Sequence, residues 1–235
     1  MILASVLAFG FPLLTLAGYA TLYLAVYQRR ADGGRSLDRH GFYWYPVFLA
    51  IPLAAALGSG PVRHELSGLW SAPAGWIAGG LAIGAALFFA ERFIVEARGP
   101  ATGSRAFLLE GRSDTWRDLK IAPAVYLVLA LVVVVTEELV WRGVLLHGLT
   151  SRYGWSQPVA LGASSAAFGL NHYYFGLRNV VYKWVFGAVW GLLLLASGSL
   201  LVPIGSHLAY EGLVGAQLLA RGRSRPQEAP RAHQL

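Results

Sequence analysis

Two adjacent acidic residues, Glu137 and Glu138, follow the most apolar run of the sequence, and Arg142 lies four residues after the second acid. The segment reads VVVVTEELVWRG over residues 132–143. A charged side chain at the centre of a membrane helix costs about 2.5–3.5 kcal/mol on insertion scales, so such groups normally face a bundle interior or a water-filled cavity. We therefore interpret this segment as a candidate site for chemistry.

Helical spacing separates the roles of the two acids. Glu138 and Arg142 stand at i and i+4 with the acid on the N-terminal side, which favours an ion pair that could be purely structural. Successive helical residues are about 100° apart, so Glu137 is directed to a different sector. Close to a second carboxylate in apolar surroundings, Glu137 should hold a proton more tightly than an exposed acid. It could then take a proton from a bound water and later return it; a buried, protonated, hydrogen-bonded glutamate is the alternative.

Two further segments contribute imidazoles. Phe168 and His172 lie one helical turn apart in AAFGLNHYYFG, and His207 and Glu211 lie one turn apart in PIGSHLAYEGL. Imidazoles can orient a water, stabilise an oxyanion or ligate a metal. A single intramembrane histidine is often only a structural residue whose ring nitrogens form hydrogen bonds inside the protein. Two of them, on separate helices in the same half of the chain as Glu137, favour a shared site.

Three motifs occur in order, each on its own hydrophobic segment. EELVWR (137–142) fits Glu-Glu-x-x-x-Arg, FGLNH (168–172) fits Phe-x-x-x-His, and HLAYE (207–211) nearly fits His-x-x-x-Asn/Asp. Together they resemble the CPBP family of intramembrane proteases, which includes type II CAAX prenyl proteases and bacteriocin-processing or immunity proteins. The resemblance covers about residues 118 to 220. It implies a glutamate-type intramembrane endopeptidase that cleaves a membrane-associated peptide or C-terminal tail.

The resemblance also implies a role for each residue of the motifs. Glu137 would activate the hydrolytic water with His172, and His207 would stabilise the oxyanion of the tetrahedral intermediate. Glu138 and Arg142 would support the site. No cofactor is implied, and the sequence has no His-Glu-x-x-His zinc pattern. A divalent metal bound by Glu137, His172 and His207 stays an open alternative.

Glu211 departs from the family pattern, which has Asn or Asp at this position. An Asn can donate a hydrogen bond to an oxyanion, whereas an ionised Glu would repel its charge. Glu211 could be protonated and donate, it could pair with His207, or Asn171 could supply the donor instead. The remaining reading is the alternative function, a non-catalytic membrane immunity or binding protein that retains the protease fold. A transporter or proton relay would need paired broken half-helices, which the sequence does not display.

The composition indicates a membrane protein. Of the residues, 56% are hydrophobic and 13% are charged, against about 25% charged in soluble domains. Spans of about 20 apolar residues divide the chain into an all-α, polytopic bundle of seven transmembrane helices. We expect these spans at Ile2–Tyr27, Phe42–Gly58, Leu69–Phe89, Ile121–Leu149, Trp155–Phe175, Val180–Ala196 and Leu200–Ala220.

The basic residues predict the orientation of these spans. Most of the 19 Lys and Arg fall in connections on one side, including Arg178 and Lys183 between the fifth and sixth spans, and the other side receives only Arg63 and Arg152. The positive-inside rule then places the N-terminus outside and the C-terminus in the cytoplasm of a multi-pass cell-membrane protein. The net charge of +7 fits anionic lipid headgroups, so we expect the bilayer and a membrane-embedded or lipid-anchored peptide as partners, and no nucleic acid.

We divide the chain into four regions by composition. Residues 1–95 form an N-terminal transmembrane scaffold, 96–118 a cytoplasmic linker, 119–220 the catalytic bundle and 221–235 a disordered basic tail. The scaffold segment WIAGGLAIGAALFFA has small residues at spacings that allow close helix approach. His172 is expected nearer the cytoplasmic end than Glu137 or His207, so the fifth span must shift or tilt if the three are to meet.

Overall fold

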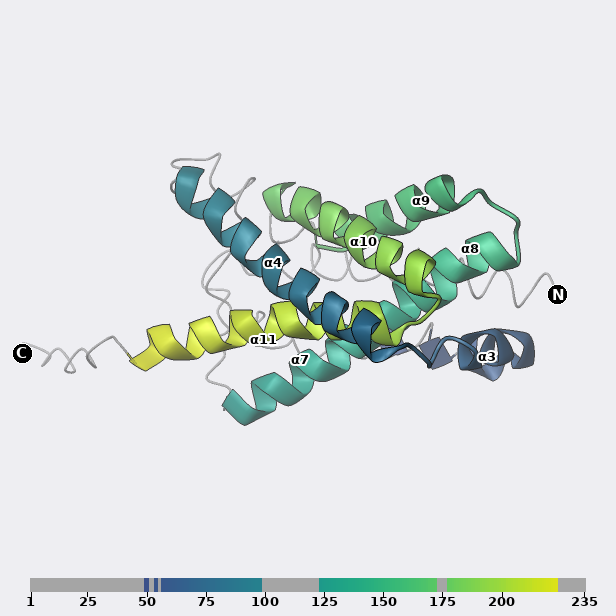
Figure 1. Ribbon diagram of the computed structural model, residues 1–235, viewed down its shortest axis with the longest axis horizontal. Coiled ribbons are helices and arrows are strands. Elements are labelled where there is room, and N and C mark those ends of the chain that lie inside the picture. The colour runs from purple at the N-terminus through teal and green to yellow at the C-terminus, as the bar shows by residue number, and fades with distance from the viewer. Residues whose placement is uncertain (1–48, 51–52, 55, 99–122, 173–176, 224–235) are drawn as a thin grey trace, which may run out of the picture.

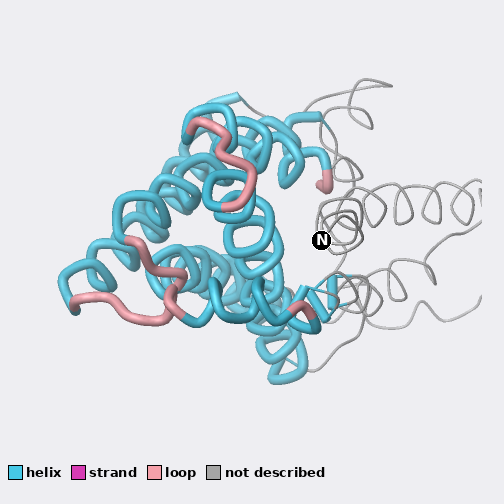
Figure 2. The backbone as a smooth tube through the Cα atoms, turned by 90° about the vertical axis from the view of Figure 1, so that its right-hand side faces the viewer, coloured by secondary structure: helices cyan, strands magenta, loops and turns pink. Residues whose placement is uncertain are grey.

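A computed structural model describes residues 49–50, 53–54, 56–98, 123–172 and 177–223, and all regular structure in these residues is helical (Figures 1 and 2). The all-α class is therefore confirmed for the described part of the chain. The helices are α3 (Gly60–Ser67), α4 (Ala74–Arg98), α7 (Pro123–Glu138), the π-helix η1 (Leu139–His147), α8 (Gly148–Ser151), α9 (Gln157–Leu170), α10 (Leu177–Ser197) and α11 (Leu201–Arg223).

The five later predicted spans each coincide with helical structure. The third is α4, the fourth is the continuous run of α7, η1 and α8, and the last three are α9, α10 and α11. The first span and most of the second lie outside the described residues, as do most of the linker and the tail. Within the described residues, two helices are long and apolar enough to cross a membrane, at Ala74–Ile94 and Leu177–Ser197. The count of seven spans thus stays a prediction.

Successive long helices run in opposite directions along the molecule (Figure 1). The C-terminal ends of α4 and α11 and the start of α7 lie at the left of that view, and the connections from α8 to α9 and from α10 to α11 lie at the right. Short helix α3 was not expected, because its residues were assigned to a loop between the second and third spans. Pro61, near its start, has the fixed φ that a first helical turn accepts.

Glycines allow α4 to lie directly against α11. A Cβ atom on Gly84 would fall 1.9 Å from the backbone oxygen of Ser206, and one on Gly80 would fall 2.8 Å from that of Val202. Only glycine permits so close a backbone approach between two helices. The small-residue spacing in this segment therefore indicated a true helix contact, and the contact is adjacent to His207.

A second close contact joins α9 to α10. A Cβ atom on Gly169 would meet the backbone oxygen of Val180 at 2.7 Å, and one on Gly187 would meet Cα of Ser165 at 3.2 Å. The pairs α4 with α11 and α9 with α10 have the most extensive helix contacts among the described elements. Of these helices, α9, which His172 follows directly, also contacts η1, and α11, which contains His207, also contacts α7.

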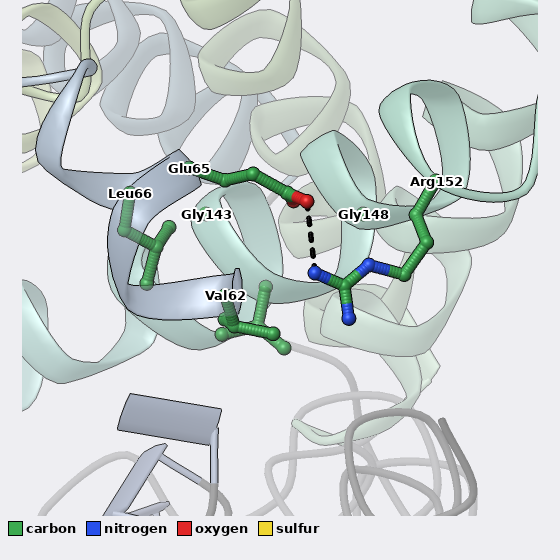
Figure 3. A pocket seen from close by; sticks show the side chains of 7 residues that line it. Val62, Glu65, Leu66, Gly143, Gly148 and Arg152 are labelled. Carbon is green, nitrogen blue, oxygen red and sulfur yellow. Dashed lines mark hydrogen bonds and ion pairs between the residues drawn. The ribbon is translucent and has the colours of Figure 1, made fainter. Parts of the chain in front are cut away.

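A small pocket lies between α3 and the η1–α8 segment (Figure 3). Its enclosed volume of about 10 Å³ is close to the minimum that holds one water. At its edge Arg152 donates to Glu65, with 2.8 Å between Nη2 and Oε1 (Figure 3). Its lining residues are Val62, Glu65, Leu66, Gly143, Val144, Gly148 and Arg152. None of the candidate site residues lines it.

Candidate active site

The two acids stand at the end of α7, where the chain changes from an α-helix to a π-helix. Glu137 and Glu138 are the last two residues of α7, and Arg142 is in η1. Uniform α-helical spacing was assumed for this segment and is wrong beyond Glu138. π-helical turns occur frequently at functional sites, and here the change falls between the acid and its arginine.

Glu138 lies between a guanidinium and an imidazole. Its Oε1 is 3.1 Å from Nη1 of Arg142 and 2.8 Å from Nδ1 of His207. Arg142 also donates through Nη2 to the backbone oxygen of Gly187, at 3.3 Å. All three ionisable groups are at most 1% exposed. The predicted pair of Glu138 and Arg142 therefore exists, and it also fixes the His207 ring.

His172 lies in a turn just after the C-terminal end of α9. Its Nδ1 is 2.9 Å from the backbone oxygen of Phe168. Because a carbonyl oxygen only accepts, Nδ1 must be the donor, and Nε2 of the neutral ring is left as an acceptor. That Nε2 is directed at Glu137, 3.7 Å from Oε1. The Phe168 ring lies against the imidazole with 4.7 Å between centroids, so the motif spacing reflects both a hydrogen bond and a packing contact.

The other oxygen of Glu137 faces His207. Oε2 of Glu137 is 3.8 Å from Nε2 of His207, whose Nδ1 donates to Glu138. Two imidazole Nε2 atoms from different helices thus converge on one carboxylate that is 2% exposed. In the neutral rings all of these facing atoms are acceptors. A proton, a water or a cation between them would relieve their mutual repulsion.

The predicted catalytic trio is therefore brought together despite the expected difference in depth. Helix α9 ends at Leu170, before the predicted end of the fifth span, and His172 in the following turn lies with Nε2 3.7 Å from Oε1 of Glu137. Neither distance to Glu137 leaves room for more than one bridging water. Asn171 is buried beside His172, 3% exposed.

Trp190 of α10 is a site residue that the sequence reading missed. Its ring stacks on that of His207 with 3.7 Å between centroids and 20° between planes, and its Nε1 donates to Ser206 Oγ at 3.1 Å. The Arg142 guanidinium lies 4.4 Å from the Phe168 ring centroid and 5.4 Å from that of Trp190. An aromatic face next to a cationic group is stabilising. A tryptophan in an apolar span gives no signal of this role.

We expect Trp190→Ala to lower the free energy of unfolding by about 3–5 kcal/mol, the usual cost of truncating a large buried aromatic. Trp190 is 0% exposed and fills the space between α10 and α11. Thermal unfolding in detergent micelles, followed by circular dichroism, measures the loss. Trp184→Ala, on the same helix at 49% exposure, is the matched control and should change stability by less than about 1 kcal/mol. Equal losses in the two variants would contradict the assignment.

Lys183 requires a correction. It was assigned to the connection between the fifth and sixth spans, but it lies inside α10 and is 7% exposed. Its Nζ is 3.7 Å from Oε1 of Glu211. The partner of Glu211 is thus a lysine, which was not among the alternatives considered for this acid. The error arose because a basic residue near the start of a span was taken as a cytoplasmic flank, although the predicted span already began at Val180.

No group of three or more His, Asp or Glu side chains arranged as metal ligands occurs among the described residues. Two imidazole nitrogens and a carboxylate do face one another at Glu137, and such atoms suit several divalent metals. The donor types therefore fit a divalent metal. Treatment with a chelator and measurement of the metal content would distinguish a metal site from a site that holds only water.

The comparisons agree with the motifs. Residues 120–213 match a family model described as Rce1-like, type II CAAX prenyl endopeptidase. This confirms the resemblance for the part of the chain that contains all three motifs. No curated protein and no solved structure matches the chain.

Proposed function

From the Rce1-like match over residues 120–213, we propose that this protein is an intramembrane endopeptidase with Glu137 as its general base. One observation supports this most directly: both oxygens of the buried Glu137 carboxylate face an imidazole Nε2, at 3.7 Å for His172 and 3.8 Å for His207. A water held among these three groups is within reach of a base on one side and of a potential hydrogen-bond donor on the other.

In the proposed reaction, Glu137 takes a proton from this water while His172 orients it through Nε2. The resulting hydroxide attacks the carbonyl carbon of the scissile peptide bond, and a tetrahedral intermediate forms with a negative oxygen. Glu137 then passes its proton to the departing amine nitrogen, the carbon–nitrogen bond breaks, and a carboxylic acid and an amine leave. General acid–base transfer of this kind contributes about 10²–10⁴-fold in rate.

His207 is proposed to stabilise the oxyanion as an imidazolium. Its Nδ1–H is already donated to Glu138, so Nε2 can donate only when the ring carries a second proton. The carboxylate of Glu138 on one side and the stacked face of Trp190 on another both favour the charged ring. The guanidinium of Arg142, 3.1 Å from the same oxygen of Glu138, favours the ionised form of this acid. Removing one oxyanion donor typically costs about 10²–10³-fold.

We propose that the protein spans the membrane several times, with the C-terminal end of α11 in the cytoplasm. The basic residues Arg98 and Arg178 lie at the ends of α4 and α10 that would face the cytoplasm. Large aromatic side chains lie exposed around the opposite ends of the helices, as interfacial anchors do. These are Trp70, Trp76, Tyr153 and Trp155, all more than 40% exposed.

The proposed substrate is a membrane-embedded or lipid-anchored peptide tail. The purified protein in liposomes should cleave a quenched fluorescent peptide with a prenylated CAAX end, or a matched peptide anchored by an apolar helix. Comparison of membrane peptides in cells with and without the protein identifies the natural tail. Solute or proton flux without cleavage would instead indicate a transporter. Protection or binding that persists when Glu137 is changed would indicate a non-catalytic immunity protein.

A chelator distinguishes a water-only site from a metal site. We expect the cleavage rate to stay within about twofold after treatment with EDTA and removal of the chelator, because Glu137 alone can accept the proton of an oriented water. Metal content is measured on the same sample by mass spectrometry. A rate that falls to background and returns on addition of Zn²⁺ or another divalent ion would show that Glu137, His172 and His207 bind a metal.

A further inference from the structure

A second, partly buried ion pair lies one helical turn beyond His207. Nζ of Lys183 is 3.7 Å from Oε1 of Glu211, and the two side chains are 9% and 23% exposed. The pair joins α10 to α11, and it is separate from the pair of Glu138 and Arg142. The mechanism above uses neither Lys183 nor Glu211.

Further contacts fix the position of the lysine. Its Nζ lies 4.6 Å from the centroid of the Tyr210 ring and 5.8 Å from that of Phe186. Tyr210 in turn donates through its hydroxyl to Glu91 of α4. Three helices therefore meet around the ammonium group. A lysine held by a carboxylate and two aromatic rings has lost the mobility that would let it extend into solvent.

Lys183 lies close to the proposed reaction centre. The Tyr210 ring, whose centroid is 4.6 Å from Nζ of Lys183, lies 6.5 Å from the His207 ring between centroids. Glu211, at i+4 from His207 on α11, would by itself bring a negative charge to the same region. In a low-dielectric interior an isolated carboxylate there would oppose a developing oxyanion. The ammonium of Lys183 cancels that charge.

We propose that Lys183 is a positioning residue of this site, which neutralises Glu211 and sets the charge environment of His172 and His207. The expected effect on catalysis rests on the proposed function. The charge environment of the two histidine rings can be measured without a substrate. It also accounts for a glutamate in a place where an ionised acid alone would oppose the reaction.

Nitrogen NMR of the histidine rings in detergent micelles tests the charge environment directly. In Lys183→Met we expect the ring signals of His172 and His207 to move from their wild-type positions, while that of His64 stays in place. The matched control is Arg152→Met, which removes the cation of the Glu65 pair outside the site and should leave the His172 and His207 signals unchanged. If both signals stay in place in a folded Lys183→Met protein, the proposal is overturned.

Peptide cleavage in liposomes tests the consequence. Lys183→Met should lower kcat about 100-fold, the size expected for losing electrostatic support of an oxyanion, with KM changed less than threefold. Lys183→Met/Glu211→Gln removes both charges together and should recover kcat to within about tenfold of wild type. If Lys183→Met does not fold, the proposal predicts that the histidine ring signals of the double variant stay near their wild-type positions, and displaced signals would contradict the proposal. A double variant that cleaves as slowly as Lys183→Met would also overturn the proposal. If the wild-type protein shows no cleavage that depends on Glu137, the proposed function is wrong. The role of Lys183 is still tested in that case, because the histidine ring signals are measured without a substrate.

Discussion

Glu137→Gln should reduce peptide cleavage by up to about 10⁴-fold while the protein stays folded. The amide has nearly the shape of the carboxylate but cannot take a proton from water, and general-base transfer contributes up to about 10⁴-fold. Of the two imidazoles that face Glu137, 3.7 and 3.8 Å away, one can accept a hydrogen bond from the amide nitrogen of the glutamine, and the other faces its amide oxygen. Cleavage of the fluorescent peptide in liposomes and thermal unfolding in micelles measure the two quantities.

Glu65→Gln is the matched control for this prediction. Glu65 lies on helix α3 and is the acid of a different ion pair, with Arg152. Its side chain is 32% exposed, so loss of the pair should cost at most about 1 kcal/mol and leave cleavage near the wild-type rate. Cleavage that survives Glu137→Gln would exclude a glutamate base at this position. The protein would then be a binding protein, or another residue would perform the chemistry.

Gly84→Ala should lower kcat about 100-fold or more without touching any group that reacts. The new Cβ would fall 1.9 Å from the backbone oxygen of Ser206, so α4 and α11 must move apart. Overpacking of this kind costs about 1–3 kcal/mol and sometimes more. Because Ser206 is followed directly by His207, the displacement also moves the imidazole that faces Glu137. A shift of about 1 Å in a reacting group can cost about 10²-fold in rate.

Gly79→Ala is the control that distinguishes displacement of α11 by the added Cβ from the general effect of replacing a glycine by alanine in α4. Gly79 is on the same helix, and nothing lies within 4 Å of the position of its added Cβ. This variant should therefore keep the wild-type rate and unfold at the same temperature or slightly higher, because alanine is a better helix former. Near-normal kcat in Gly84→Ala would mean that the contact of α4 with α11 does not position His207.

The composition and the three motifs were enough to anticipate the helical class and the residues that converge. A membrane helix tolerates an ionisable group only where that group has a function or a partner, so Glu137, Glu138 and Arg142 stood out from the apolar sequence around them. The i and i+4 spacing correctly predicted the pair of Glu138 and Arg142. Whether the converging residues catalyse a reaction is a prediction that the variants above will test.

The contributions that the sequence did not reveal are the stacking of Trp190 and the pairing of Lys183 with Glu211. Trp190 reads as one more apolar residue, yet it stacks on the His207 ring. Lys183 was assigned to a loop, because a basic residue near the start of a span is usually a cytoplasmic flank. Glu211 could not be paired from sequence, since its partner is on another helix. Such contacts depend on how helices rotate against each other, which local spacing does not determine.

The π-helical segment from Leu139 to His147 makes the number of residues in this part of the chain as important as their identity. Its backbone accommodates more residues per turn than an α-helix does. Deleting a single apolar residue between Trp141 and Leu146 would let the backbone return to α-helical winding. An insertion or deletion that no such change of winding absorbs would turn the parts of the chain on either side by about 100° relative to each other. Natural variants of this protein should therefore tolerate exchanges of one aliphatic residue for another in this segment far better than insertions or deletions.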